Sequence, residues 1–424
     1  MGGRFQELRR RTFRSLRMEN YRKYFFGHAS SVIGTWMQRI GQDWLVLEIT
    51  DSALALGGSV ACQFLPVLLG GVWGGVVVDR VDTRRLLIIT QLAQAVLAAA
   101  LAVFALTGTA TLLIVYALAA GLGVVTVFDN PARQSFVAEL VEPADIINAQ
   151  ALSSLVNNVG RLVGPALAGL CIVATGVGVT FVINAVSFLA VLISLFTMDV
   201  GALLPKLVAP RAPGQAREGL RYVWHHPTLR ATVLLAAVVS VFGQNFRVVF
   251  PILATDTFHG DATTYGWLTA ALGLGAVVGA LLSAAATTTT TWRLLWVCVA
   301  FAGANLAVAA APDLTIALLA IVVLGVLNIL FNTLARTILQ LSTDPGMRGR
   351  VMAIHVMVFL GGIPVGGPLI GLLCELWGPR LGMVVAGVMC LVGCIAVGPG
   401  LRRLRSSEAI GSEPTPEGSP QPAG

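Results

Sequence analysis

The sequence predicts an all-α membrane protein with twelve transmembrane helices in two pseudo-symmetric six-helix bundles. Three observations support this fold class: a succession of long apolar stretches, a one-sided distribution of basic residues, and a second half of the chain that repeats the plan of the first. A helix that crosses a bilayer needs about 20 predominantly apolar residues. The apolar stretches meet that length from residue 24 to residue 399.

The apolar stretches are separated by short polar breaks. They lie at residues 24–49, 53–78, 86–107, 111–130, 148–173, 177–198, 230–255, 263–286, 293–311, 314–340, 350–374 and 379–399. The bundles are therefore expected at 24–199 and 230–400, joined by a loop at 200–229 that contains several prolines. A basic tail at 1–23 precedes them. The tail at 401–424 is rich in Ser, Pro, Gly and Glu, and is expected to be disordered.

Basic residues set the predicted orientation, because lysine and arginine accumulate on the cytoplasmic side of membrane proteins. With the N-terminus in the cytoplasm, only Arg380 of the 28 Lys and Arg residues falls outside, and Arg39, Arg161 and Arg247 lie within helices. Both termini are thus expected in the cytoplasm. The net charge of +7 is then a topology signal. Nucleic-acid binding is not expected, because the basic residues are spread over many loops instead of one face.

An internal repeat supports two related halves. At an offset of 203 residues Phe128 matches Phe331, and at an offset of 209 residues Gly57 matches Gly266. Such matches are sparse, but they keep the same order. Transporters built from repeats place the substrate near the bilayer midplane, between the two halves.

Other chemistry is not expected. The six cysteines sit in or beside apolar helices and are interpreted as small apolar side chains. The five histidines form no set of metal ligands. The chain has no P-loop and no nucleophile–base arrangement, so the sequence predicts neither an enzyme nor a cofactor, and ATP is not the direct energy source.

The most specific motif follows the second apolar stretch. It reads Gly75-Val76-Val77-Val78-Asp79-Arg80-Val81-Asp82-Thr83-Arg84-Arg85. It resembles the signature between helices 2 and 3 of the major facilitator superfamily, whose layout is also six plus six helices with a cytoplasmic linker. The resemblance implies a conformational latch, with Asp129 at the inner end of helix 4 pairing with Arg80 or Arg84. The latch residues are Gly75, Asp79, Arg80, Arg84, Arg85 and Asp129.

A second motif lies in the fifth apolar stretch, where Gly160, Gly164 and Pro165 resemble the G-x-x-x-G-P signature of exporters in the same superfamily. Glycine removes side-chain bulk and proline bends a helix. We therefore expect helix 5 to pack closely across the bundle interface. Gly367 and Pro368 form the counterpart in helix 11, and generic helix packing is the alternative interpretation.

A further run narrows the resemblance. Asp129-Asn130-Pro131-Ala132-Arg133-Gln134-Ser135, followed by Asn157-Asn158 and Arg161, resembles the branch that contains the enterobactin exporter and macrolide and multidrug efflux proteins. The resemblance covers about residues 15–400. Many proton-driven drug exporters of the superfamily carry an arginine inside helix 4, whereas residues 112–128 contain none.

The resemblance implies a secondary active transporter in the bacterial cytoplasmic membrane. It is expected to export a small bulky organic compound, either a drug-like molecule or a siderophore, by proton antiport with alternating access. We expect a monomer whose partners are the substrate, protons and the lipid bilayer. Two alternatives stay open: an uptake symporter of the same fold, and a non-transporting membrane receptor or assembly factor.

Ionisable residues within the predicted helices are functional candidates, because charge inside a membrane is costly. Arg39 and Asp43 are four residues apart on helix 1, so they share a face and can pair. Asp43 is the predicted proton carrier and Arg39 its partner, with a structural ion pair as the alternative. Arg161 can bind an anionic group or bond to Asn157. Glu48 is a further coupling candidate, nearer the outer end.

Aromatic and amide side chains of the inner helices are candidates for the lining of a substrate cavity, because such a surface suits bulky amphipathic compounds. These candidates are Trp36, Gln38, Gln42, Gln63, Phe64, Asn157, Asn245, Arg247, Asn328 and Asn332.

Overall fold

The computed structural model describes residues 13–205, 215–285 and 290–410, and within these ranges every regular element is a helix. The first half of the chain contributes six long helices that pack on one another, with α2 against α6 and α7, and α5 against α3 and α4. Their bounds are α2 (Glu19–Thr50), α3 (Ala53–Arg80), α4 (Thr83–Leu106), α5 (Leu112–Leu140), α6 (Ile146–Thr175) and α7 (Val177–Phe196). Short 3-10 turns flank them at η1 (Arg14–Arg17), η2 (Pro143–Asp145) and η3 (Val200–Ala202).

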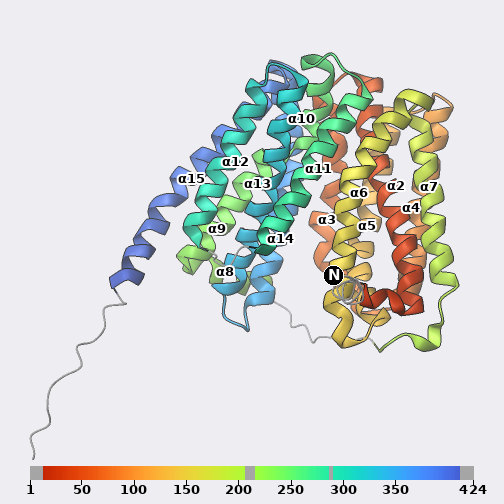
Figure 1. Ribbon diagram of the computed structural model, residues 1–424, viewed down its shortest axis with the longest axis horizontal. Coiled ribbons are helices and arrows are strands. Elements are labelled where there is room, and N and C mark those ends of the chain that lie inside the picture. The colour runs from red at the N-terminus through yellow and green to blue at the C-terminus, as the bar shows by residue number, and fades with distance from the viewer. Residues whose placement is uncertain (1–12, 206–214, 286–289, 411–424) are drawn as a thin grey trace, which may run out of the picture.

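The second half begins with a short helix and continues with long ones, in which α11 packs on α13 and α12 packs on α13 and α15. Figure 1 shows this half in green to blue beside the first half in red to yellow. Its elements are α8 (Gln215–His225), α9 (Pro227–Val238), η4 (Val239–Gly243), α10 (Phe246–Ile252), η5 (Leu253–Thr257), α11 (Ala262–Ala285), α12 (Thr291–Ala310), α13 (Leu314–Leu341), α14 (Arg348–Trp377) and α15 (Pro379–Ile410). We call the end of the molecule that carries α8 the linker end, and the opposite end the far end.

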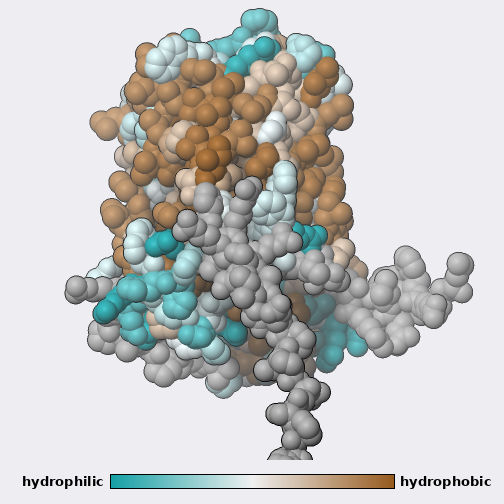
Figure 2. All heavy atoms as spheres, turned by 90° about the vertical axis from the view of Figure 1, so that its left-hand side faces the viewer, coloured by the Kyte–Doolittle hydropathy of each residue, from teal (hydrophilic) through white to brown (hydrophobic). Residues whose placement is uncertain are grey.

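Eleven helical segments in the described ranges are long and apolar enough to cross a membrane, by length and composition. α2 is not among them, although it has 32 residues, because it carries polar and charged side chains such as Gln38, Arg39 and Asp43. Figure 2 shows apolar side chains over the middle of one face, with hydrophilic side chains gathered toward its two ends. Large apolar residues such as Leu113 and Ile193 stay exposed, as expected for a surface that meets lipid tails.

Three elements differ from the predicted bounds. α5 continues past residue 130 to Leu140, because Asp129 and Arg133 pair on one face of the helix and offset each other's charge. α8 forms within the predicted loop at 200–229, and α15 continues to Ile410, into the tail that was expected to be disordered. The predicted basic tail up to residue 12, the prolines of 206–214 and the tail at 411–424 lie outside the described residues.

The two halves meet through glycines that bring helix backbones together. A Cβ on Gly57 of α3 would collide with the carbonyl oxygen of Gly367 in α14, and a Cβ on Gly266 of α11 would lie 2.7 Å from the carbonyl oxygen of Pro165 in α6. Pro165 and Gly367 therefore lie at the interface between the halves. Further close approaches follow these helix pairs from the far end, at Gly371, to the middle, at Gly273.

This packing predicts that replacing two different glycines of α3 by alanine has opposite effects on stability. Gly57→Ala places a methyl group against the backbone of α14, and is expected to lower the free energy of unfolding by about 1–3 kcal/mol. Gly71→Ala is the matched control, because no atom lies within 4 Å of the added Cβ. Alanine is also the better helix former, so the control is expected to be neutral or slightly stabilising. Melting temperatures of the purified variants in detergent test this, and equal melting temperatures would contradict the interface.

Candidate functional site

A fully buried carboxylate connects the two halves of the molecule. Asp43 of α2 has no exposed surface. Arg247 of α10 donates to it twice, from Nε to Oδ2 at 2.9 Å and from Nη2 to Oδ1 at 2.6 Å. Tyr265 of α11 donates its hydroxyl to Oδ2 at 2.8 Å. All three bonds come from the second half, and a bidentate arginine–carboxylate pair is among the strongest polar contacts in proteins.

The surroundings hold Arg247 in place. Its Nη1 donates to the Gln63 side-chain oxygen of α3 at 2.8 Å, so its guanidinium contacts two helices of the first half. The π-helical segments η4 and η5 flank α10, so the regular helix is interrupted on both sides of this arginine. Such π-helical turns often occur at functional sites. The cluster lies toward the far end, because α2 ends at Thr50 and α11 begins at Ala262.

The predicted pairing of Arg39 with Asp43 is wrong. Asp43 is already bound by Arg247 and Tyr265, whereas the guanidinium of Arg39 lies over the Trp36 ring, 4.6 Å from its centroid. The Arg39 Nε is buried and has no hydrogen-bond partner.

Arg161 of α6 lies beside the same Trp36 ring. Its guanidinium carbon lies 5.8 Å from the centroid of the Trp36 ring. The alternative of a bond between Arg161 and Asn157 is not found, and the exposed Asn157 amide donates to the Ser153 carbonyl oxygen at 2.9 Å. Glu48 accepts a bond from the Trp44 indole at 2.8 Å and is exposed near the far end.

A second buried charge cluster lies within the first half. Asp129 of α5 accepts bonds from Thr90 and Gln91 of α4, each at 2.8 Å, and from Arg133 Nε at 2.5 Å. Arg133 Nη1 lies 2.6 Å from His28 Nδ1 of α2. Because α5 continues beyond its predicted end, Arg133 is an arginine inside helix 4 of the predicted layout. The expectation that this helix has none is therefore wrong. The four-residue spacing of Asp129 and Arg133 was the signal in the sequence.

Five of the six predicted latch residues lie toward the linker end, where α3 ends at Arg80 and α4 begins at Thr83, whereas Asp129 lies in the buried cluster of α5. The predicted pairing of Asp129 with Arg80 or Arg84 is wrong, because Arg133 pairs with Asp129 and Arg84 donates to the Leu195 carbonyl oxygen at 2.8 Å. The remaining latch residues, Gly75, Asp79 and Arg85, lie beside this turn at the ends of α3 and α4.

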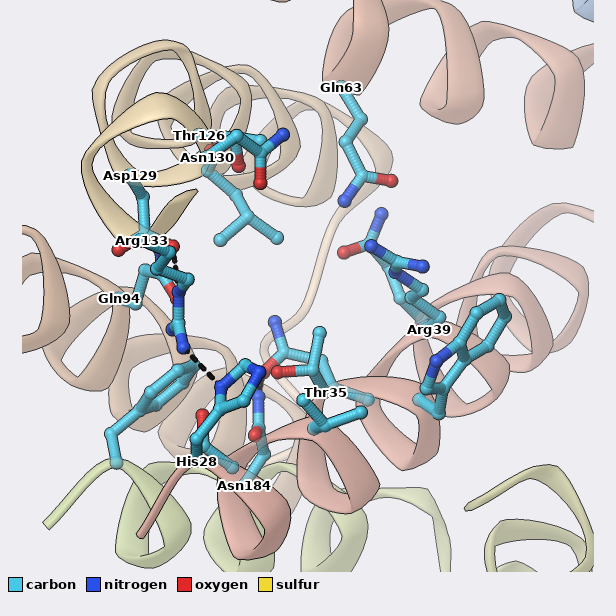
Figure 3. Close-up of a pocket in the computed structure, with 17 residues that line it drawn as sticks. His28, Thr35, Arg39, Gln63, Gln94, Thr126, Asp129, Asn130, Arg133 and Asn184 are labelled. Carbon is cyan, nitrogen blue, oxygen red and sulfur yellow. Dashed lines mark hydrogen bonds and ion pairs between the residues drawn. The ribbon is translucent and has the colours of Figure 1, made fainter. Parts of the chain in front are cut away.

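A polar cavity lies between the helices of the first half, with a volume of about 720 Å³ counting the part open to solvent. Of the predicted lining residues, Trp36, Gln38, Gln42 and Gln63 line it. Phe64, Asn157, Asn245, Arg247, Asn328 and Asn332 do not. Figure 3 shows the labelled side chains around the cavity, with Arg133 between Asp129 and His28. Eight polar lining residues were not predicted as site residues: His28, Ser31, Thr35, Gln94, Thr126, Asn130, Arg133 and Asn184.

Comparison with known proteins identifies the family. Residues 10–422 match the profile of the transmembrane secretion effector family, a branch of the major facilitator superfamily. The chain belongs to this family. It is therefore a multi-pass membrane transporter of the major facilitator type, and membership of a transporter family agrees with the lack of catalytic motifs in the sequence.

Its relatives in this family include exporters. The chain is 25% identical over 362 residues to the staphyloferrin A transporter of Staphylococcus aureus, covering 84% of this chain and 90% of the relative. It is 27% identical over 395 residues to the multidrug efflux pump Tap of Mycolicibacterium fortuitum, covering 89% and 95%. It is 25% identical over 415 residues to the enterobactin exporter EntS of Citrobacter koseri, covering 94% and 95%.

A solved structure shares the fold. A bacterial homolog of the human lysosomal transporter Spinster, in an inward-facing and unoccupied conformation, superimposes with a TM-score of 0.72 at 16% identity. The match covers 91% of this chain and 97% of that structure.

The buried ion pair predicts strong energetic coupling between Asp43 and Arg247. Arg247→Gln leaves a buried carboxylate without its cation, and is expected to cost about 3–5 kcal/mol of stability. The double variant Asp43→Asn with Arg247→Gln is expected to cost less than the sum of the single variants, by about 0.5–3 kcal/mol. Unfolding of the four proteins in detergent measures this cycle. Arg336→Gln, at an exposed arginine of α13, is the control, and additive costs would show that the pair is not coupled.

Proposed function

We propose that this transporter exports a small bulky organic compound in exchange for protons, by alternating access. The observation that carries the proposal is the Asp43 carboxylate, which belongs to the first half and is bound by Arg247 and Tyr265 of the second. A group that is shared across a moving boundary can convert its protonation state into a change of conformation.

The physical argument starts from the charge of Asp43. Ionised Asp43 holds α10 and α11 against α2 and so keeps the far end closed. Protonation of Asp43 removes the charge and weakens both bonds from Arg247, which favours separation of α10 and α11 from α2. Loss of the proton restores the ion pair. A ligand or proton can shift such an equilibrium only through its different affinity for the two states.

The orientation follows from the distribution of basic residues. We infer that the linker end faces the cytoplasm, because Arg80, Arg84, Arg85 and Arg336 lie there. Both termini are then cytoplasmic, and α2 is the twelfth span, which gives two bundles of six helices in the bacterial cytoplasmic membrane. The close helix contacts at the far end correspond to a transporter closed to the outside. An exporter loads its substrate in such a state.

The two predicted motifs take complementary roles in this scheme. Gly160 and Gly164 let α6 approach α2, while Pro165 contacts α11 of the other half. The latch residues at the linker end would hold that end closed when the far end opens. We propose that one chain contains a complete pathway and works as a monomer.

Export is favoured over the uptake symporter by the helix 5 motif and by the relatives, which include an enterobactin exporter and a multidrug efflux pump. A non-transporting receptor would have no need of a buried ion pair between the halves.

The test is gradient-dependent efflux from cells loaded with fluorescent dyes, one anionic and one cationic so that dye charge does not decide the outcome. Wild-type cells are expected to expel at least one dye, and an uncoupler is expected to stop it. Asp43→Asn cannot exchange a proton at this site, and the gradient-dependent rate is expected to fall about tenfold or more, a change of about 1.4 kcal/mol in the barrier.

Glu48→Gln is the matched control, because Glu48 lies on the same helix but is exposed and outside the cluster. It is expected to keep the wild-type rate. Full gradient-dependent efflux by Asp43→Asn would exclude Asp43 as the proton carrier. Gradient-driven accumulation of dye would favour the uptake symporter.

A further inference from the structure

Two arginines from different helices converge on one aromatic ring beside the cavity. Arg39 of α2 lies 4.6 Å from the centroid of Trp36, and Arg161 of α6 lies 5.8 Å from it. Trp36 and Arg39 both line the cavity. Figure 3 shows Arg39 at the edge of the cavity, on the side where Gln63 reaches toward it.

The close packing of α2 and α6 brings Arg161 near the Trp36 ring. A Cβ on Gly164 would lie 2.5 Å from the Cβ of Trp36, and one on Gly160 would lie 3.3 Å from its ring. Only glycine at these two positions lets the indole lie against α6. The spacing Gly160-Arg161-x-x-Gly164 therefore brings a cation and the backbone of α6 to the same aromatic side chain.

Neither arginine has an acidic partner among the described residues. Asp43 is bound by Arg247 and Tyr265, and Asp129 is bound by Arg133, Thr90 and Gln91. The Arg39 Nε is buried without a hydrogen-bond partner. A guanidinium has five donors in a fork that matches carboxylate oxygens, so most of this donor capacity is unused.

The local charge is therefore positive. Arg247 pairs with Asp43 and Arg133 pairs with Asp129, which leaves Arg39 and Arg161 without an ion pair of their own. Unpaired charges in a membrane-spanning region are costly, and they persist where a ligand or a water-filled path meets them. The remaining lining is rich in amides and hydroxyls, such as Gln38, Gln42 and Thr35, which suit an oxygen-rich ligand.

We propose that Arg39 and Arg161, which both lie beside the Trp36 ring, bind an organic anion that carries carboxylate or similarly acidic oxygen groups. This deepens the proposed function, on which it rests for the role of the cavity, because it names the class of substrate. A lipophilic cation, a common kind of efflux substrate, would be repelled from the same place. Arg39 and Arg161 are then substrate-binding residues, and Asp43 alone keeps the coupling role.

The test compares two dyes built on the same xanthene ring: fluorescein, which is an anion at neutral pH, and a rhodamine, which is a cation. Their binding to the full-length purified transporter in nanodiscs is measured by fluorescence anisotropy, with empty nanodiscs as the blank. The wild type is expected to bind fluorescein about tenfold or more tightly than rhodamine, the effect of a charge-assisted hydrogen bond.

Arg39→Gln and Arg161→Gln are each expected to lower that preference about tenfold. Arg39→Lys keeps the positive charge but loses the paired guanidinium donors. Its preference for fluorescein is expected to lie between that of the glutamine variants and that of the wild type. Arg336→Gln, which removes an exposed arginine of α13, controls for net charge and is expected to keep the wild-type preference. The ratio of the two affinities is the readout, because partial unfolding would reduce both.

Three results would overturn the proposal: equal or tighter binding of rhodamine, an unchanged preference in both glutamine variants, or binding of neither dye. The assay needs no proton gradient. Anion binding without gradient-driven efflux would therefore leave this inference standing and remove the proposed function. Gradient-driven efflux of the cationic dye alone would support the proposed function and contradict the inference of an anion site.

Discussion

The arrangement of this transporter depends on the need to compensate one carboxylate away from water. Asp43 is fully buried, and a buried charge is tolerated only when it is paired and hydrogen-bonded. The second half supplies the cation through Arg247 and a further hydrogen bond through Tyr265. The two halves are therefore joined at Asp43. The same contact takes Asp43 away from Arg39, its neighbour on the helix. In the proposed mechanism this one interaction closes the far end, and it leaves Arg39 free to bind a ligand.

Glycine makes that interaction geometrically possible. The side chains of Asp43 and Arg247 can meet only if α2, α10 and α11 lie near one another, and the backbones of α6 and α11 approach closely at Gly266 and Gly169. Small residues at helix interfaces allow such approach in membranes, where apolar side chains gain little from leaving lipid. The contacts of α3 with α14 and of α6 with α11 join the two halves at two places. A rocking movement about them would separate the ion pair without breaking either half.

The sequence could predict what depends on neighbouring residues. Long apolar stretches predicted the helices, and the spacing of glycines and prolines predicted that Pro165 and Gly367 lie at the interface. It could not predict the partner of Asp43, because Arg247 is 204 residues away in the chain and a residue four positions away offered a plausible pair. The end of α5 was missed for a related reason: Asp129 and Arg133 look like loop residues until their mutual pairing is known. The spacing of Asp129 and Arg133 fits one helical turn and could have extended the helix, whereas the pairing of Asp43 with Arg247 joins two helices and leaves no periodic signal in the sequence.

In the proposed mechanism, Arg39 and Arg161 select the substrate, and Asp43 with Arg247 couples transport to protons. Trp36, Arg39 and Arg161 all belong to the first half, so a rocking movement carries them as a unit and leaves their geometry unchanged. Their affinity for an anion can then differ between the two states only through the second half, whose charged contact at this place is Arg247. In this mechanism a proton on Asp43 weakens its bonds from Arg247 and leaves Arg39 and Arg161 in place. Because coupling requires differential affinity, it must arise at the boundary between the halves, while the choice of substrate is made within the first half.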